Sequence, residues 1–259
     1  MRVVRLCVLG FLAYVISMLV LFPLSPIVAQ IEPHIAPVKL AGVNGKIYSG
    51  TVDSVMYDDG LLPLEFSNVA WSLSPGTLLK GGTGARISYQ GYGGGGEGQV
   101  LRKWDGNIAL SDFTFDAQTK EFESLLPIPG LASFTGQLSG SIAELVMENQ
   151  LLELFTGKFQ WVDASVTSDF FSAQLGELNI DIEPTGEKQH VAEVNASGGE
   201  IELAGSIDMT QNGDFSADIL ITPTTNTSSQ LINNLRRFAR PESGGRYRYT
   251  QKGNVNRLL

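Results

Sequence analysis

Apolar and polar residues alternate strictly through the segment Gly199–Pro223. A period of two is typical of β-strands that have one buried face and one wet face. Asn212 and Gly213 divide the segment, and this pair tolerates the positive φ of a tight hairpin turn. We therefore predict a long antiparallel hairpin, whose apolar face consists of Ile201, Leu203, Ile207, Met209, Phe215, Ile219 and Ile221.

An apolar sheet face must be covered by a helix, by a second sheet layer or by a ligand. One convincing helix follows the hairpin, because residues 231–239 show a helical apolar period and Pro241 ends it. We predict that this helix seals the face by packing against Met209, Phe215 and Ile221. The alternative is a groove that is open to lipid or to a strand of a partner protein.

Shorter alternating segments, separated by glycines, continue the pattern over most of the chain. They predict a first strand at Val43–Val52, another around Trp71, and a third at Arg86–Gln90. A change of phase near Ser111–Asp112 predicts a bulge. The segment Ala143–Phe155 fits a helix almost as well as two strands, and we predict strands because both neighbouring segments alternate.

The N-terminal region contains the apolar, uncharged run Leu6–Leu24, which as a helix spans about 28 Å, close to the thickness of a bilayer core. Arg2 and Arg5 precede it, which favours a cytoplasmic N-terminus. A cleaved signal peptide is the alternative, and the length of the run favours a retained anchor. The predicted segments are a cytoplasmic N-terminus (1–5), a transmembrane anchor (6–24), a proline-rich linker (25–37) and a periplasmic β-rich domain (38–259).

The resulting fold class is mainly β: an N-terminal transmembrane helix, then a curled, largely antiparallel β-sheet domain with one late amphipathic helix.

The formal net charge of -9 is spread unevenly, since residues 1–30 carry +2 and residues 236–259 carry +6, which leaves -17 between them. An acidic body repels phosphate backbones, so nucleic acid is not expected as a partner. The candidate docking residues for an acidic partner or for lipid headgroups are Arg236, Arg237, Arg240, Arg246 and Arg248.

Little in the sequence suggests a reaction. Gly91–Gly98 has the GxGxxG spacing of dinucleotide-binding loops, but a strand pattern follows it where that motif needs a helix, so we predict a flexible hairpin loop. His34 and His190 have no partners at metal-ligand spacing and are predicted to be solvated, and Cys7 is the single cysteine. We expect no catalytic residue, no cofactor and no metal, and therefore no enzyme.

With these features placed, the chain resembles the type II secretion system protein N family. The resemblance rests on the basic N-terminus and anchor, Val43–Gly50, Val69–Leu73 with Leu78 and Leu79, Gly157–Ala164, Gly205–Ile207, and the arginine-rich helix with Gly245–Tyr247. It implies a single-pass inner-membrane protein with a periplasmic domain. Such a protein would work with other type II secretion system components in the export of folded proteins across the outer membrane.

The same order of an anchor and glycine-punctuated strands is also similar to the AsmA-like envelope proteins. That resemblance implies a curled sheet with an apolar groove, and a function in lipid transport or outer-membrane maintenance. Lipid is therefore an alternative partner.

Overall fold

The computed structural model describes residues 24, 28, 35–58, 63–125, 132–148, 151–168, 172–186 and 188–254. Residues 6–23 of the predicted transmembrane anchor, most of the predicted linker and His34 lie outside these residues. Within the described part of the chain, no helix has the length and apolar character needed to cross a membrane.

The protein is mainly β, and the strands of its described residues form one open antiparallel sheet of fifteen strands. Strands that follow one another in sequence are mostly neighbours in the sheet, except that β2 and β1 both pair with β3, and β15 lies between β13 and β14. The strands are β1 (Val38–Ala41), β2 (Asn44–Lys46), β3 (Ser49–Tyr57), β4 (Leu64–Ser74), β5 (Gly82–Gly91), β6 (Gly94–Lys103), β7 (Ile108–Gln118), β8 (Ser133–Glu148), β9 (Leu151–Thr167), β10 (Ser172–Gly186), β11 (Gln189–Gly198), β12 (Ile201–Thr210), β13 (Asp214–Pro223), β14 (Arg240–Pro241) and β15 (Tyr247–Asn254).

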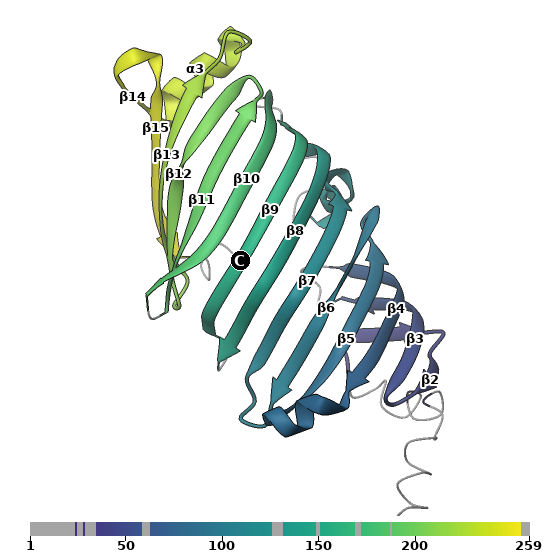
Figure 1. Ribbon diagram of the computed structural model, residues 1–259. Helices are drawn as coiled ribbons and strands as arrows, with labels where there is room; N and C mark the ends of the chain where they lie inside the picture. The colour runs from purple at the N-terminus through teal and green to yellow at the C-terminus, as the bar shows by residue number, and fades with distance from the viewer. Residues whose placement is uncertain are drawn as a thin grey trace, which may run out of the picture.

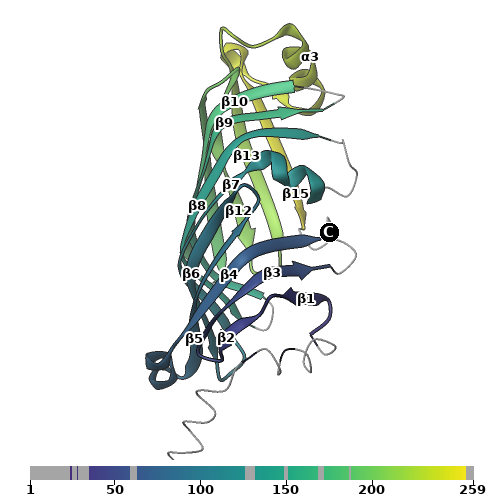
Figure 2. The same cartoon turned by 90° about the vertical axis from the view of Figure 1, so that its right-hand side faces the viewer.

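The sheet is strongly twisted and curls into a trough, with β1–β3 near one end and β13–β15 near the other (Figures 1 and 2). The helical elements among the described residues are the 3-10 turns η2 (Pro75–Lys80), η3 (Thr119–Leu125) and η4 (Ser243–Gly245), and the α-helix α3 (Ser229–Phe238). Figure 2 shows α3 on the inner side of the curl, at the β13–β15 end. Within the described part of the chain, the inner side of the sheet therefore has helical cover over only part of its area.

The predicted hairpin of residues 199–223 is confirmed as β12 and β13, which pair from Ile201 opposite Pro223 to Met209 opposite Phe215. Its loop contains three residues, and Gly213 (φ 82°) has the positive φ, whereas Asn212 does not. A three-residue loop with glycine at the left-handed position is a common alternative to the two-residue turn.

Two further predictions are confirmed. Residues 143–148 belong to the long strand β8 and residues 151–155 to the long strand β9, and not to a helix. The predicted bulge lies in β7, because three residues of β6 (Glu97 to Gln99) oppose four of β7 (Ser111 to Thr114), and Asp112 has a positive φ of 50°. The bulge lets Leu110 and Phe113 face the same side of the sheet although they are three residues apart.

Two predictions about the N-terminal half are wrong. Val43–Val52 is not one strand but a hairpin, in which β2 turns back into β3 so that Lys46 pairs with Ser49. The glycine run is not a flexible loop, because Gly94 to Gly98 lie within β6 and the hairpin turn is formed by Tyr92 and Gly93, which both have positive φ. A strand follows the glycine run, so it cannot serve as the phosphate-binding start of a helix.

Helix α3 is held at the end of the sheet by its first turn. The Ser228 side chain caps the helix by accepting a hydrogen bond from the Leu231 N–H (3.2 Å). Glu200, which precedes β12, accepts from the N–H groups of Ser228 (3.3 Å) and Gln174 (3.0 Å), which ties the helix start to two strands. The helix then buries Leu231 and Leu235 against the sheet.

Candidate functional site

One face of the sheet is apolar over most of its width. Residues that pair directly across antiparallel strands point to the same face. Successive pairs trace a row across ten strands, in which every residue is apolar, aromatic or glycine: Tyr89, Gly96, Phe115, Gly140, Phe159, Ile180, Val194, Gly205, Ile219 and Tyr249. At strand spacings of about 4.8 Å, this row runs for roughly 40 Å.

Parallel rows extend the same face along the strands. One consists of Phe113, Ile142, Gly157, Ile182, Ala192, Ile207 and Ala217. Another consists of Ala117, Leu138, Trp161, Leu178, Ala196, Leu203, Ile221 and Tyr247. We call the face formed by these three rows the apolar face. All seven residues of the hairpin's predicted apolar face lie on it, by register and alternation.

Aromatic rings line the middle of the apolar face. Their centroids follow one another at 4.9 Å (Phe66 to Tyr89), 6.2 Å (Tyr89 to Phe113), 6.4 Å (Phe113 to Phe115) and 6.0 Å (Phe115 to Phe159). Such distances lie in the range of favourable ring contacts. The rings therefore form a connected series from β4 to β9.

Glycines on the intervening strands make room for these rings. A Cβ atom at Gly140 would lie 2.5 Å from the Phe115 ring and 2.9 Å from the Phe159 ring. A Cβ atom at Gly96 would lie 2.8 Å from the Tyr89 ring. The rings thus lie over β6 and β8 because those strands have no side chain at these positions.

The cover of the apolar face differs between its end and its middle. At the β13–β15 end, α3 forms a buried cluster with the sheet, composed of Ala173, Ile201, Ile221, Leu231, Leu235, Ala239 and Tyr247. Leu203 and Ile219 pack against this cluster. In the middle, Phe113, Phe115 and Phe159 remain partly exposed. Helix α3 therefore seals one end and leaves the ring-lined part accessible.

The predicted packing of Met209 and Phe215 against the helix is not found among the described contacts of this cluster. Both residues are partly exposed, and both lie at the turn end of the hairpin, where they pair with each other. Ile221 lies at the opposite end, near α3. Six residues of extended strand separate Phe215 from Ile221, which is about 20 Å.

His190 was expected to be solvated, and this prediction is wrong, because its side chain is 1% exposed. Its Nε2 accepts a hydrogen bond from the N–H of Phe155 at 3.0 Å, while Nδ1 has no partner among the described atoms. Burial lowers the pKa of His190, which favours the neutral ring.

The position of Pro184 explains this contact. Pairing of β9 with β10 stops at Gly157 opposite Ile182, although β9 continues to Leu151 and β10 to Gly186. The next partner for Phe155 would be Pro184, which has no N–H to donate to a ladder. The strands separate there, and His190 on β11 supplies the acceptor for Phe155.

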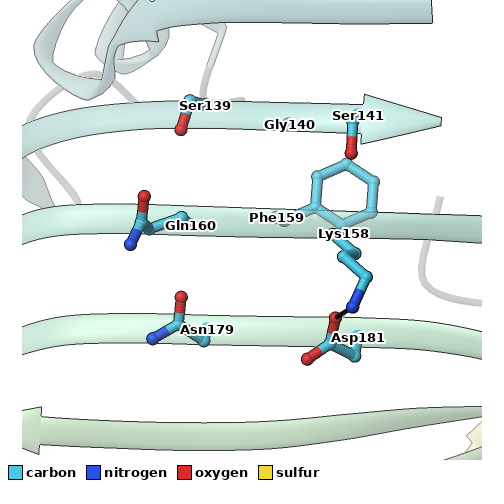
Figure 3. A pocket seen from close by; sticks show the side chains of 8 residues that line it. All are labelled: Ser139, Gly140, Ser141, Lys158, Phe159, Gln160, Asn179 and Asp181. Atoms are coloured by element: carbon cyan, nitrogen blue, oxygen red, sulfur yellow. Dashed lines mark ion pairs between the residues drawn. The ribbon is translucent and has the colours of Figure 1, made fainter. Parts of the chain in front are cut away.

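The opposite face of the sheet is polar. Figure 3 shows two rows of polar side chains on β8, β9 and β10, with Lys158 paired to Asp181 at 3.0 Å. They line a shallow hollow of about 470 Å³. The hydrogen bond to Asp181 raises the pKa of Lys158, and hydrogen bonds from Asn179 and Gln160 lower the pKa of Glu177. These partners satisfy one another, as expected of a solvated sheet face.

The five candidate docking arginines lie at the β13–β15 end, in two groups. Arg236 and Arg237 at the end of α3, and Arg240 on β14, are exposed. Arg248 is engaged, because it bonds Asp218 at 3.0 Å and Glu242 at 2.7 Å. The Arg246 Nε donates to the Ser243 carbonyl at 3.3 Å.

The aromatic series is not apparent from the sequence alone. Its signal is an aromatic residue on one strand opposite a glycine on the next, as in Tyr89 with Gly96 and Phe115 with Gly140. That signal becomes visible only once the pairing register is known.

Two comparisons with known proteins, one with a family model and one with a relative, point to the same family. The family model described as "Type II secretion system (T2SS), protein N" matches residues 36–250. The "Type II secretion system protein N" of Aeromonas hydrophila is 21% identical over 258 residues, which cover 97% of this chain and 98% of the relative. No solved structure matches the chain.

Proposed function

The chain belongs to the type II secretion system protein N family, and we propose that it is an accessory component that contributes to the export of folded proteins from the periplasm across the outer membrane. In this proposal Leu6–Leu24 anchors the chain in the inner membrane with residues 1–5 in the cytoplasm. Residues 38–259 then work in the periplasm with other components of the system.

The observation that carries the proposal is the extent of the family match, because residues 36–250 include nearly all of the described sheet. The sheet itself offers two wide faces and a basic end, which suit a protein that acts through contacts with others. In the described part of the chain, no group of three or more histidine, cysteine, aspartate or glutamate residues is arranged to hold a metal ion.

The test is deletion of the gene, with two assays in parallel. Loss of exoprotein secretion with an intact outer-membrane barrier, restored by the full chain from a plasmid, is the expected result. Normal secretion in the deletion strain would contradict the proposal.

For topology, a C-terminal alkaline phosphatase fusion should be active and membrane-bound, and a soluble product beginning at Gln30 would contradict the anchor.

A second candidate function is lipid binding, as in the AsmA-like proteins, and the partly exposed rings of the apolar face favour it. The backbone groups beneath the rings are paired within the sheet, so an occupant there gains apolar contacts and few hydrogen bonds. An acyl chain fits this chemistry. Normal secretion together with a leaky, detergent-sensitive outer membrane in the deletion strain would support this candidate over the first.

A further inference from the structure

The sheet has an edge at β15 that is largely unpaired. On the edge that faces the rest of the sheet, β15 pairs with β13 from Tyr247 opposite Ile221 to Asn254 opposite Asp214. On its outer side, the described structure gives it only the two-residue strand β14, opposite Tyr247 and Arg248. An unpaired strand edge is a template for a further strand.

The outward backbone groups of this edge can be identified from alternation. The Arg246 carbonyl accepts from the Glu242 N–H at 2.8 Å, so it points away from β13. Alternate residues of a strand direct their N–H and C=O groups to the same side. Thr250 and Lys252 therefore present their backbone groups outward, beyond the reach of β14.

An exposed aromatic side chain lies beside this edge on the inner side of the curl. Phe238, the last residue of α3, is 52% exposed, and its ring meets the Tyr249 ring edge-on at 6.4 Å. A large exposed aromatic next to an unpaired edge is a typical anchor for a partner's apolar side chain. A strand added at β15 would place its inward side chains next to Tyr249 and Phe238.

The positive charge of residues 236–254 indicates which kind of partner strand would bind at this edge. Residues 236–254 carry six cations and one acid, Glu242, in a chain whose net charge is -9. Lys252 lies in the middle of the outer edge, and Arg240 is directly opposite Arg248. Cationic side chains on an edge disfavour pairing with another basic strand and favour an acidic one.

A second copy of this chain does not fit that requirement. The opposite end of its sheet is formed by β1 and β2, whose charged residues are Lys39 and Lys46. Edge-to-edge pairing between copies would therefore bring lysines toward the lysine and arginines of β15.

We propose that the outer edge of β15 binds an extended acidic segment of a partner protein as an added β-strand. The segment's acidic side chains lie beside Lys252 and Arg240, and its apolar side chains lie beside Tyr249 and Phe238. This inference does not depend on the proposed function, because it requires only a partner segment in which acidic and apolar residues alternate.

The test uses a capped peptide of alternating valine and glutamate, about eight residues long, which is within the usual range of strand lengths. Fluorescently labelled, it is titrated into the full chain in detergent, and binding is followed by anisotropy. We expect saturable binding with slowed amide exchange in residues 247–254. In a valine–lysine peptide of equal length, lysines would lie beside Lys252 and Arg240 in place of glutamates. Each opposite-charge pair lost in this way contributes up to about 1 kcal/mol to binding, so this peptide should bind at least about fivefold more weakly.

Two variants locate the binding. Thr250→Pro removes an outward N–H and leaves the bonds to β13, so it should weaken binding of the valine–glutamate peptide at least tenfold, roughly the loss of one or two hydrogen bonds. Lys252→Glu should reverse the preference between the two peptides, while Lys158→Glu on the distant polar face should not. Absence of binding, equal binding of both peptides, or an unchanged preference in Lys252→Glu would each overturn the proposal.

Discussion

The two parts of the apolar face that differ most are its helix-covered end and its ring-lined middle. At the end, Leu235 and Leu231 of α3 are 1% and 2% exposed and lie over Ile221. In the middle, Phe115 and Phe159 lie on the same face of the same sheet, in a neighbouring row, but stay partly exposed. Both parts have the same alternation of apolar and polar residues.

The difference shows that alternation determines which side of a strand is apolar, but not what covers it. Cover at the end comes from one amphipathic helix of ten residues, about 15 Å long. That length is well short of the roughly 40 Å of the longest apolar row. Among the described residues, the rings in the middle of the face stay partly exposed, so this part of the face is available to a ligand or a partner protein.

The largest expected effect comes from one substitution made at two positions of the same face. Ile221→Asp places a carboxylate in the sealed cluster, where an uncompensated charge costs about 3–5 kcal/mol, a large part of a domain's usual stability. Ile207 is itself partly exposed, so Ile207→Asp should cost only about 1–2 kcal/mol, because water reaches the charge. Urea titration of both variants measures the difference.

Equal losses in the two variants would contradict the comparison. If Ile207→Asp unfolded the chain as Ile221→Asp does, the helix seal would extend over the whole hairpin, as the sequence pattern alone suggested.

A smaller effect is expected from Gly140→Ala in the middle of the face. The new methyl group would meet the rings of Phe115 and Phe159, which can move toward the open side, so the cost should be about 1 kcal/mol, at the lower end of the overpacking range. Gly205→Ala is the matched control on the same row, since its methyl group would lie 2.2 Å from the Asp218 carbonyl oxygen, which the sheet holds in place. Thermal unfolding should rank Gly205→Ala as clearly more damaging, and the reverse ranking would contradict an open middle.

The smallest effect concerns pH and His190, which is buried on this face and is not part of the cluster beneath α3. Because burial lowers the pKa of His190, the unfolded chain takes up a proton first as pH falls through about 6.5. Stability should therefore decrease from about pH 7 toward the lowered pKa of the folded state. His190→Gln keeps an acceptor for Phe155 without titrating, so its melting temperature should fall less over this interval, and an equal fall would contradict a buried neutral ring.

The local elements of this fold were predictable from sequence. The β12–β13 hairpin, the bulge at Asp112 and helix α3 each depend on residues near one another in the chain. The hairpin at Val43–Val52 was missed because Ile47 and Tyr48, at its turn, are residues that favour strands.

The features of the candidate site depend on distant partners. His190 stands in a polar run, and its burial follows from the loss of pairing at Pro184 and from Phe155, which is 35 residues away. The aromatic series requires the register of several strands, and the open middle requires knowing where α3 ends. Neither follows from periodicity.

The most direct test of the central claim compares thiol accessibility in the ring-lined middle of the apolar face with that in the cluster beneath α3. In a Cys7→Ser background, Phe159→Cys and Leu235→Cys are exposed to a maleimide in the native, delipidated chain. An open middle predicts that the cysteine at 159 reacts readily while the cysteine at 235 reacts only on unfolding. Equal protection of the two thiols in the native chain would contradict the account.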